Sequence, residues 1–103
     1  LSTERSLERE MLVGVCQIDL FVPESGSLKS KRFVLTSLKT RIRNKFNVSV
    51  SEVDGNDKWQ RVTLAVSMVA NERRIIDQTM SQILNLISQD GRCEILDHMV
   101  EFF

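Results

Sequence analysis

The side chains with the clearest chemical potential are a run of cations in the first half of the chain. Residues 25–51 carry no acidic residue and seven basic ones: Lys29, Lys31, Arg32, Lys39, Arg41, Arg43 and Lys45. The other 76 residues hold seven basic and fourteen acidic side chains. Because clustered cations attract phosphate through counterion release, we predict an anion- or nucleic-acid-binding surface formed by Lys29, Lys31, Arg32, Lys39 and Arg43. The alternative is a solvated face whose cations pair with acids elsewhere in the protein.

The start of the predicted basic helix gives a second reason to expect a site. Lys29, Lys31 and Arg32 fall in about its first turn, where each cation opposes the helix dipole by roughly 0.3–1 kcal/mol. A local preference that is broken without visible compensation favours a functional site. Together with Ser25, Ser27 and free backbone N–H groups, these cations could hold a phosphate or carboxylate. The pattern GxxxxGK[ST] is absent, so this is not a P-loop.

The remaining reactive residues give weaker signals. Cys16 and Cys93 lie far apart in apolar runs, and we expect them to be buried free thiols. His98 is the only histidine, with no second histidine or cysteine at ligand spacing, so we predict no metal site and no cofactor. A nucleophilic pair between His98 and either cysteine has no supporting signature. Trp59, the only tryptophan, either covers one end of the core or is an exposed anchor for a partner or a base.

Six secondary-structure elements must position these residues. Alternation of apolar and polar residues predicts strands, and a 3.6-residue apolar period predicts helices. The strands are expected over 11–22, 47–54, 60–70 and 93–102, and the helices over 28–46 and 72–89. Ser27 and Asn71 are the predicted N-caps, and Gly91 is the predicted stop of the second helix.

The order βαββαβ predicts a ferredoxin-like α+β fold, a four-stranded antiparallel sheet with two helices on one face. The first and third strands are the most apolar and are expected in the centre, with the more polar second and fourth strands at the edges. Leu64 and Ile83 are expected in the core between sheet and helices. The open face should present Val13, Val15, Gln17, Thr63, Ala65 and Ser67.

This open face bears on function in two ways. It is more apolar than a solvated face usually is, which favours a homodimer. It also lacks, at these positions, the aromatic side chains on which RNA-recognition domains stack bases. Acylphosphatases share the fold, but their Val-Gln-Gly motif with its phosphate-binding arginine is missing here, and we do not expect an enzyme.

Length and composition fit one domain. We expect a single domain over residues 11–103, preceded by residues 1–10 as a disordered extension or a cloning remnant. No apolar run approaches the roughly 20 residues of a membrane span, and no signal-peptide pattern is present, so we expect a cytoplasmic protein without a membrane partner.

Several segments resemble the YlxP-like family of small uncharacterised bacterial proteins. They are Met11-Leu12-Val13-Gly14-Val15, Ser27-Leu28-Lys29-Ser30-Lys31-Arg32, Glu52-Val53 and Trp59-Gln60-Arg61. The resemblance implies a ferredoxin-like fold and a bacterial cytoplasmic protein whose gene often lies among translation and ribosome-maturation genes. It implies no activity and no catalytic residues. The sequence therefore predicts a non-catalytic module that binds RNA or ribosomal particles through the basic helix. The alternative is a self-associating protein-interaction or small-ligand-binding module with no nucleic-acid role.

Overall fold

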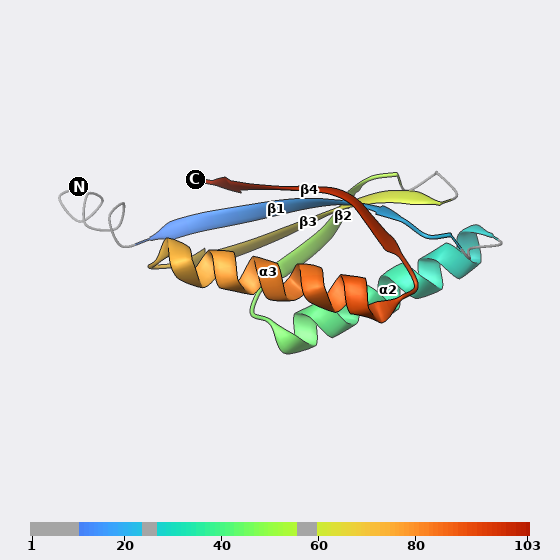
Figure 1. Cartoon of the computed structure of the whole chain (residues 1–103), viewed down its shortest axis with the longest axis horizontal. Coiled ribbons are helices and arrows are strands. Elements are labelled where there is room, and N and C mark those ends of the chain that lie inside the picture. Colours follow the sequence, from blue (N-terminus) through green and yellow to red (C-terminus); the bar gives the residue numbers. More distant parts are fainter. Residues whose placement is uncertain (1–10, 24–26, 56–59) are drawn as a thin grey trace.

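The computed structural model describes residues 11–23, 27–55 and 60–103. It contains the six elements in the predicted order (Figure 1), and each boundary lies within two residues of the expected one. The elements are β1 (Leu12–Phe21), α2 (Leu28–Lys45), β2 (Ser49–Asp54), β3 (Arg61–Ala70), α3 (Arg73–Asp90) and β4 (Glu94–Phe102). No helix in these ranges is long and apolar enough to cross a membrane.

The four strands form one antiparallel sheet in the order β2-β3-β1-β4. The two apolar strands β1 and β3 are central, and the more polar β2 and β4 are the edges, as predicted. Both helices cover the same face of the sheet (Figure 1). The ferredoxin-like prediction is therefore confirmed.

The core lies between the sheet and the two helices. Ile18 and Leu64 are opposite each other in β1 and β3, and both are fully buried. Ile83 of α3 is also fully buried, so the predicted phases of strand and helix are correct. Gly14 lets α3 approach β1 closely, because a Cβ atom there would lie 2.3 Å from Cγ2 of Ile76.

The ends of the helices follow the sequence with one exception. Ser27 caps α2 by accepting a hydrogen bond from the backbone N–H of Ser30 at 3.1 Å, and Gly91 ends α3 with a φ of 81°. The prediction that Asn71 caps α3 was wrong. Ala70 is still paired with β1, so Asn71 and Glu72 form the turn, and Glu72 becomes the cap without a side-chain capping bond.

The face of the sheet opposite the helices is the predicted open face. Val15 lies opposite Ser67, Gln17 opposite Ala65, and Asp19 opposite Thr63. Alternation along each strand places these residues on the side away from Ile18 and Leu64. The structure thus has two distinct surfaces that could recognise a partner, the helical side carrying α2 and the open face.

Candidate nucleic-acid interface

Lys31 lies inside the molecule, although it belongs to the predicted cationic surface. Its side chain is fully buried. The ammonium Nζ donates hydrogen bonds to the carbonyl oxygens of Gly55, at 2.6 Å, and Arg61, at 2.9 Å. Buried ammonium groups need such acceptors because desolvation of the charge is costly. Lys31 therefore joins α2 to the ends of β2 and β3, and its ammonium does not face solvent.

Two further cations of α2 share one carboxylate. Glu52 lies opposite Leu64 in the sheet, so its side chain points to the helical side. The Glu52 carboxylate accepts hydrogen bonds from both Nη atoms of Arg32 and, at 2.6 Å, from Nζ of Lys39. Burial alone would raise the pKa of Glu52, but the hydrogen bonds from Arg32 and Lys39 outweigh it, and the pKa lies below its ordinary value. The single negative charge of Glu52 is thus shared between the positive charges of Arg32 and Lys39.

A similar cluster lies at the end of α3. The carboxylate of Asp90 accepts hydrogen bonds from Arg41 of α2 and from Arg92 in the turn before β4. Hydrogen bonds from Arg92 lower the pKa of Asp90. Arg92 also donates to Oγ of Ser37 at 3.0 Å, so its guanidinium is held in one position between the two helices.

The remaining cations of α2 meet no carboxylate within the described residues. Arg43 donates to the carbonyl oxygen of Val50 at 2.7 Å, and Nζ of Lys45 lies 5.8 Å from the ring centre of Phe46. Lys29 is exposed, and its ammonium forms no hydrogen bond or ion pair with any other described residue. Of the predicted site residues, the structure therefore places Arg32, Lys39 and Arg43 around β2, Lys29 in solvent and Lys31 in the core.

These contacts leave positive charge on one side of the protein. We define the α2 charge cluster as the six cations of α2 other than the buried Lys31, together with Arg92, Glu52 and Asp90. It contains seven cations and two carboxylates, whereas the rest of the described chain contains four cations and seven carboxylates. Several of those carboxylates, Asp19, Asp54, Asp97 and Glu101, belong to the open face by their register. The helical side is hence basic and the open face acidic.

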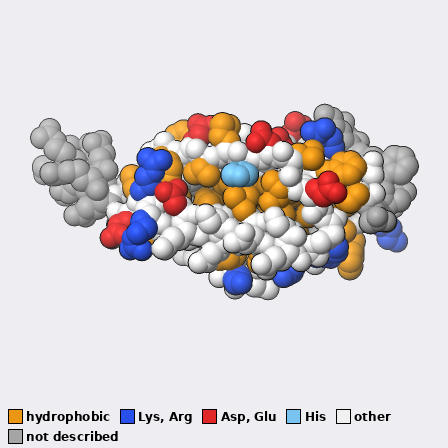
Figure 2. All heavy atoms as spheres, in the orientation of Figure 1, with side chains coloured by type: hydrophobic (Ala, Val, Ile, Leu, Met, Phe, Trp, Pro, Cys, Tyr) orange, Lys and Arg blue, Asp and Glu red, His pale blue; other side chains and the backbone are white. Residues whose placement is uncertain are grey.

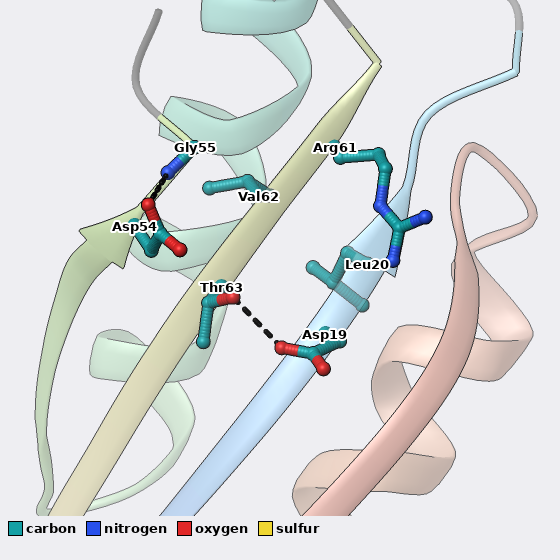
Figure 3. Close-up of a pocket in the computed structure, with 7 residues that line it drawn as sticks. All are labelled: Asp19, Leu20, Asp54, Gly55, Arg61, Val62 and Thr63. Carbon is teal, nitrogen blue, oxygen red and sulfur yellow. Dashed lines mark hydrogen bonds between the residues drawn. The ribbon is translucent and has the colours of Figure 1, made fainter. Parts of the chain in front are cut away.

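A shallow hollow of about 340 Å³ lies at the acidic end of the open face. Figure 3 shows Asp19, Thr63 and Asp54 on three neighbouring strands, with the hydroxyl of Thr63 directed to Asp19. That hydroxyl donates to Oδ1 of Asp19 at 2.7 Å, and Oδ1 of Asp54 accepts from the backbone N–H of Gly55. Arg61 also lines the hollow, so it contains two carboxylates and one cation and does not have the excess of positive charge that would attract phosphate groups.

The described residues show no arrangement of histidine or cysteine side chains that indicates a metal site or a nucleophilic cysteine. Figure 2 shows His98 among hydrophobic side chains on the side formed by β4 and α3. No group of three or more potential metal ligands occurs in the described part of the chain. Cys16 and Cys93 are buried free thiols, as predicted. Burial, as the largest effect, raises the pKa of Cys93 to about 11, which is opposite to the lowered pKa of a nucleophilic cysteine.

Trp59, the predicted partner anchor, lies outside the described residues. The structure instead shows an exposed aromatic residue on α2 that sequence reasoning missed, Phe33, whose exposed fraction is 71%. Its position outside the apolar stripe of the helix was the available signal. Glu52 was also missed as the partner of Arg32 and Lys39, although it lies two residues after Val50 and alternation along β2 directs both side chains to the helical side.

Comparison with known proteins gives the family but no activity. Residues 13–100 match the family described as "Protein of unknown function (DUF503)". The chain is 33% identical over 92 residues to "Uncharacterized protein YlxP" of Bacillus subtilis (strain 168). The alignment covers 89% of this chain and all of that protein. Among solved structures, "De novo designed protein Foldit4" aligns with a TM-score of 0.54 and 17% identity, covering 91% of this chain and 97% of the designed one. That likeness supports the fold alone. The chain belongs to the DUF503 family, to which the YlxP-like resemblance had pointed.

Proposed function

We propose that this protein is a non-catalytic binding module that binds RNA on the helical side, through the α2 charge cluster. The supporting observation is the excess of cations in that cluster, where seven cations meet two carboxylates. Each of these carboxylates is already shared between two cations. Phosphate groups of RNA supply the missing negative charge and release their counterions on binding.

The internal hydrogen bonds of the cluster favour this proposal. Glu52 fixes Arg32 and Lys39, and the carbonyl oxygen of Val50 fixes Arg43. Arg32 is still 44% exposed in its side chain. A guanidinium has five N–H donors, so an arginine held at one carboxylate keeps donors for a phosphate. Side chains that are already ordered lose less conformational entropy when a ligand binds.

The open face is a poor alternative surface for RNA. The middle of its central strands carries Val15, Gln17, Ala65 and Ser67, none of which can stack on a base. The face also bears the acidic residues Asp19, Asp54, Asp97 and Glu101. Repulsion between these carboxylates and phosphate directs RNA to the helical side.

A pair of charge-reversed variants tests the proposal. Lys29→Glu with Lys45→Glu changes two exposed cations of α2, and Arg61→Glu with Arg74→Glu changes net charge equally away from α2. The assay is fluorescence anisotropy with a single-stranded RNA over a range of salt concentrations. The α2 variant should bind more weakly, and each lost phosphate contact should reduce the log–log salt slope by roughly 0.7 units. Equal losses in both variants, or no binding by the wild type at low salt, would refute the proposal.

The resemblance to a family encoded among translation genes makes ribosomal particles the first natural RNA to test. Sedimentation of the protein with ribosomal subunits at low and high salt is the suitable measurement. A cytoplasmic location belongs to the same proposal. Buried free thiols at Cys16 and Cys93, typical of proteins in reducing compartments, support it.

A second candidate function is self-association through the open face. Val69 and Met99 are 62% and 51% exposed, and their strands place them on the open face with Val13 and Val15. Two copies that stack their sheets would cover this apolar end. Sedimentation equilibrium at micromolar concentration should show a homodimer that Val69→Lys weakens. Leu28→Lys on the helical side, at 49% exposure, is the matched control, and a wild-type monomer throughout would exclude the dimer.

A further inference from the structure

A groove of about 510 Å³ opens between the start of α2 and the turn that joins α3 to β4. Val22, directly after β1, and Phe33 and Val34 of α2 supply apolar walls, and Gly91 forms part of the opposite side. Lys29 and Arg92 also line it. We call it the Phe33 groove. In Figure 1 the turn after α3 lies beside α2, which brings these three segments of the chain together.

Phe33 is the unusual residue of this groove. It is 71% exposed, although a benzyl side chain gains free energy when it leaves water. Phe33 lies on α2 one helical turn after Lys29 and directly after Arg32. Proteins that bind single-stranded nucleic acids use this arrangement of an exposed ring beside cations. A base stacks on the ring, and the phosphates lie at the cations.

We propose that the Phe33 groove binds one unstacked base of single-stranded RNA, with the base stacked on the Phe33 ring and the adjoining phosphate at Lys29. This inference rests on the proposed RNA-binding function and specifies where and how a base is held. Val22 and Val34 provide an apolar floor for the flat base. The space beside Gly91 on the opposite side is open, since a Cβ atom there would have no heavy atom within 4 Å.

The charges of the groove favour a nucleotide over an uncharged apolar ligand. The ammonium of Lys29 forms no hydrogen bond or ion pair with another described residue and is free to meet a phosphate. The guanidinium of Arg92 is fixed by Asp90 and Ser37, so it adds positive potential without needing to reorder. An acidic peptide with an aromatic side chain would satisfy the same charges, and the experiment below separates the two.

The decisive variants are Phe33→Ala, Phe33→Tyr and the control Phe103→Ala. Phe103 is a phenylalanine of similar exposure, 73%, and follows β4 outside the groove. The probes are a short single-stranded polyuridine, a double-stranded RNA of equal length, heparin and polyglutamate, all at low salt. Thermal melts should show that the three variants fold as the wild type does, because both rings are exposed.

We expect Phe33→Ala to bind polyuridine at least about fivefold more weakly, the lower end of the measured effect of removing one stacking partner. Its binding to double-stranded RNA and heparin should stay at the wild-type level, and Phe33→Tyr and Phe103→Ala should retain polyuridine binding. Unchanged polyuridine binding by Phe33→Ala, or an equal loss for heparin, overturns the base site while leaving the α2 charge cluster as the RNA surface. Tight polyglutamate binding that requires Phe33 overturns it in favour of an acidic protein partner. Absence of any RNA binding by the wild type refutes the proposed function itself.

Discussion

Replacement of Lys31 by methionine tests whether a cation of the basic helix is part of the protein interior. Methionine keeps a long apolar stem in the same space but removes the charge and the donors. In the wild type, the ammonium donates to the carbonyl oxygens of Gly55 and Arg61 at 2.6 and 2.9 Å. Each buried carbonyl that loses its donor costs about 1–3 kcal/mol. Relief of the desolvation of the ammonium offsets part of this loss, so Lys31→Met should lower the free energy of unfolding by about 2–4 kcal/mol.

Urea unfolding followed by circular dichroism measures this loss, with the m-value as a check that the unfolded state is unchanged. Lys29→Met is the matched control. It removes an exposed cation two residues away and should change stability by no more than about 0.5 kcal/mol. If Lys31→Met loses less than about 0.5 kcal/mol, the ammonium does not bind these carbonyl oxygens in the interior, and the assignment of Lys31 to the core is refuted.

Three further predictions concern single residues. Because the folded-state pKa of Glu52 lies below its ordinary 4.5, its carboxylate stabilises the fold above about pH 4.5, and this contribution is lost as the pH falls through the folded-state pKa. Glu52→Gln should therefore lower stability at pH 7 by about 1–2 kcal/mol and reduce the decline seen in thermal melts at acid pH; an unchanged acid decline would contradict this. Gly14→Ala should destabilise by about 1–3 kcal/mol through overpacking against Ile76, and a neutral result in urea unfolding would mean that α3 does not approach β1 so closely. With the pKa of its thiol near 11, buried Cys93 should resist iodoacetamide at pH 8 in the native protein and react in urea, whereas rapid native alkylation would show an accessible thiolate.

The elements and their arrangement were predictable because they depend on periodicity. Alternation along 60–70 identified the face of Leu64, and the helical period along 72–89 identified that of Ile83; both are fully buried. The cap of α3 was misassigned by one residue, since Asn71 is the preferred capping type but β3 extends to Ala70, and the helix begins one residue later than the pattern indicates.

Contacts between segments that are distant in the sequence determine which cations of α2 are buried and which are paired. At about 100° per residue, Lys31 lies within the apolar arc of α2 together with Leu35 and Leu38, so its burial could have been read from the sequence. Its acceptors could not, because Gly55 and Arg61 reach it only through the position of the β2–β3 hairpin.

The Phe33 groove was also beyond sequence reasoning. Phe33 lies well outside the apolar arc of α2, which predicts exposure. The groove itself requires Gly91 and Arg92, which are almost sixty residues away and are brought to α2 by the packing of α3. Charge patterning could therefore suggest a basic helix but not the surface on which its remaining cations and its exposed ring meet.

The most direct test of RNA binding by the helical side is a two-dimensional NMR titration of the ¹⁵N-labelled protein with single-stranded RNA at low salt. We predict that the largest amide shifts occur along α2, near Lys29, Phe33 and Lys45, and that they diminish as salt is added. Amides in the middle of the open face, such as those of Gln17 and Ala65, should change little. Largest shifts on the open face, or no salt-sensitive shifts at all, would contradict RNA binding through the α2 charge cluster.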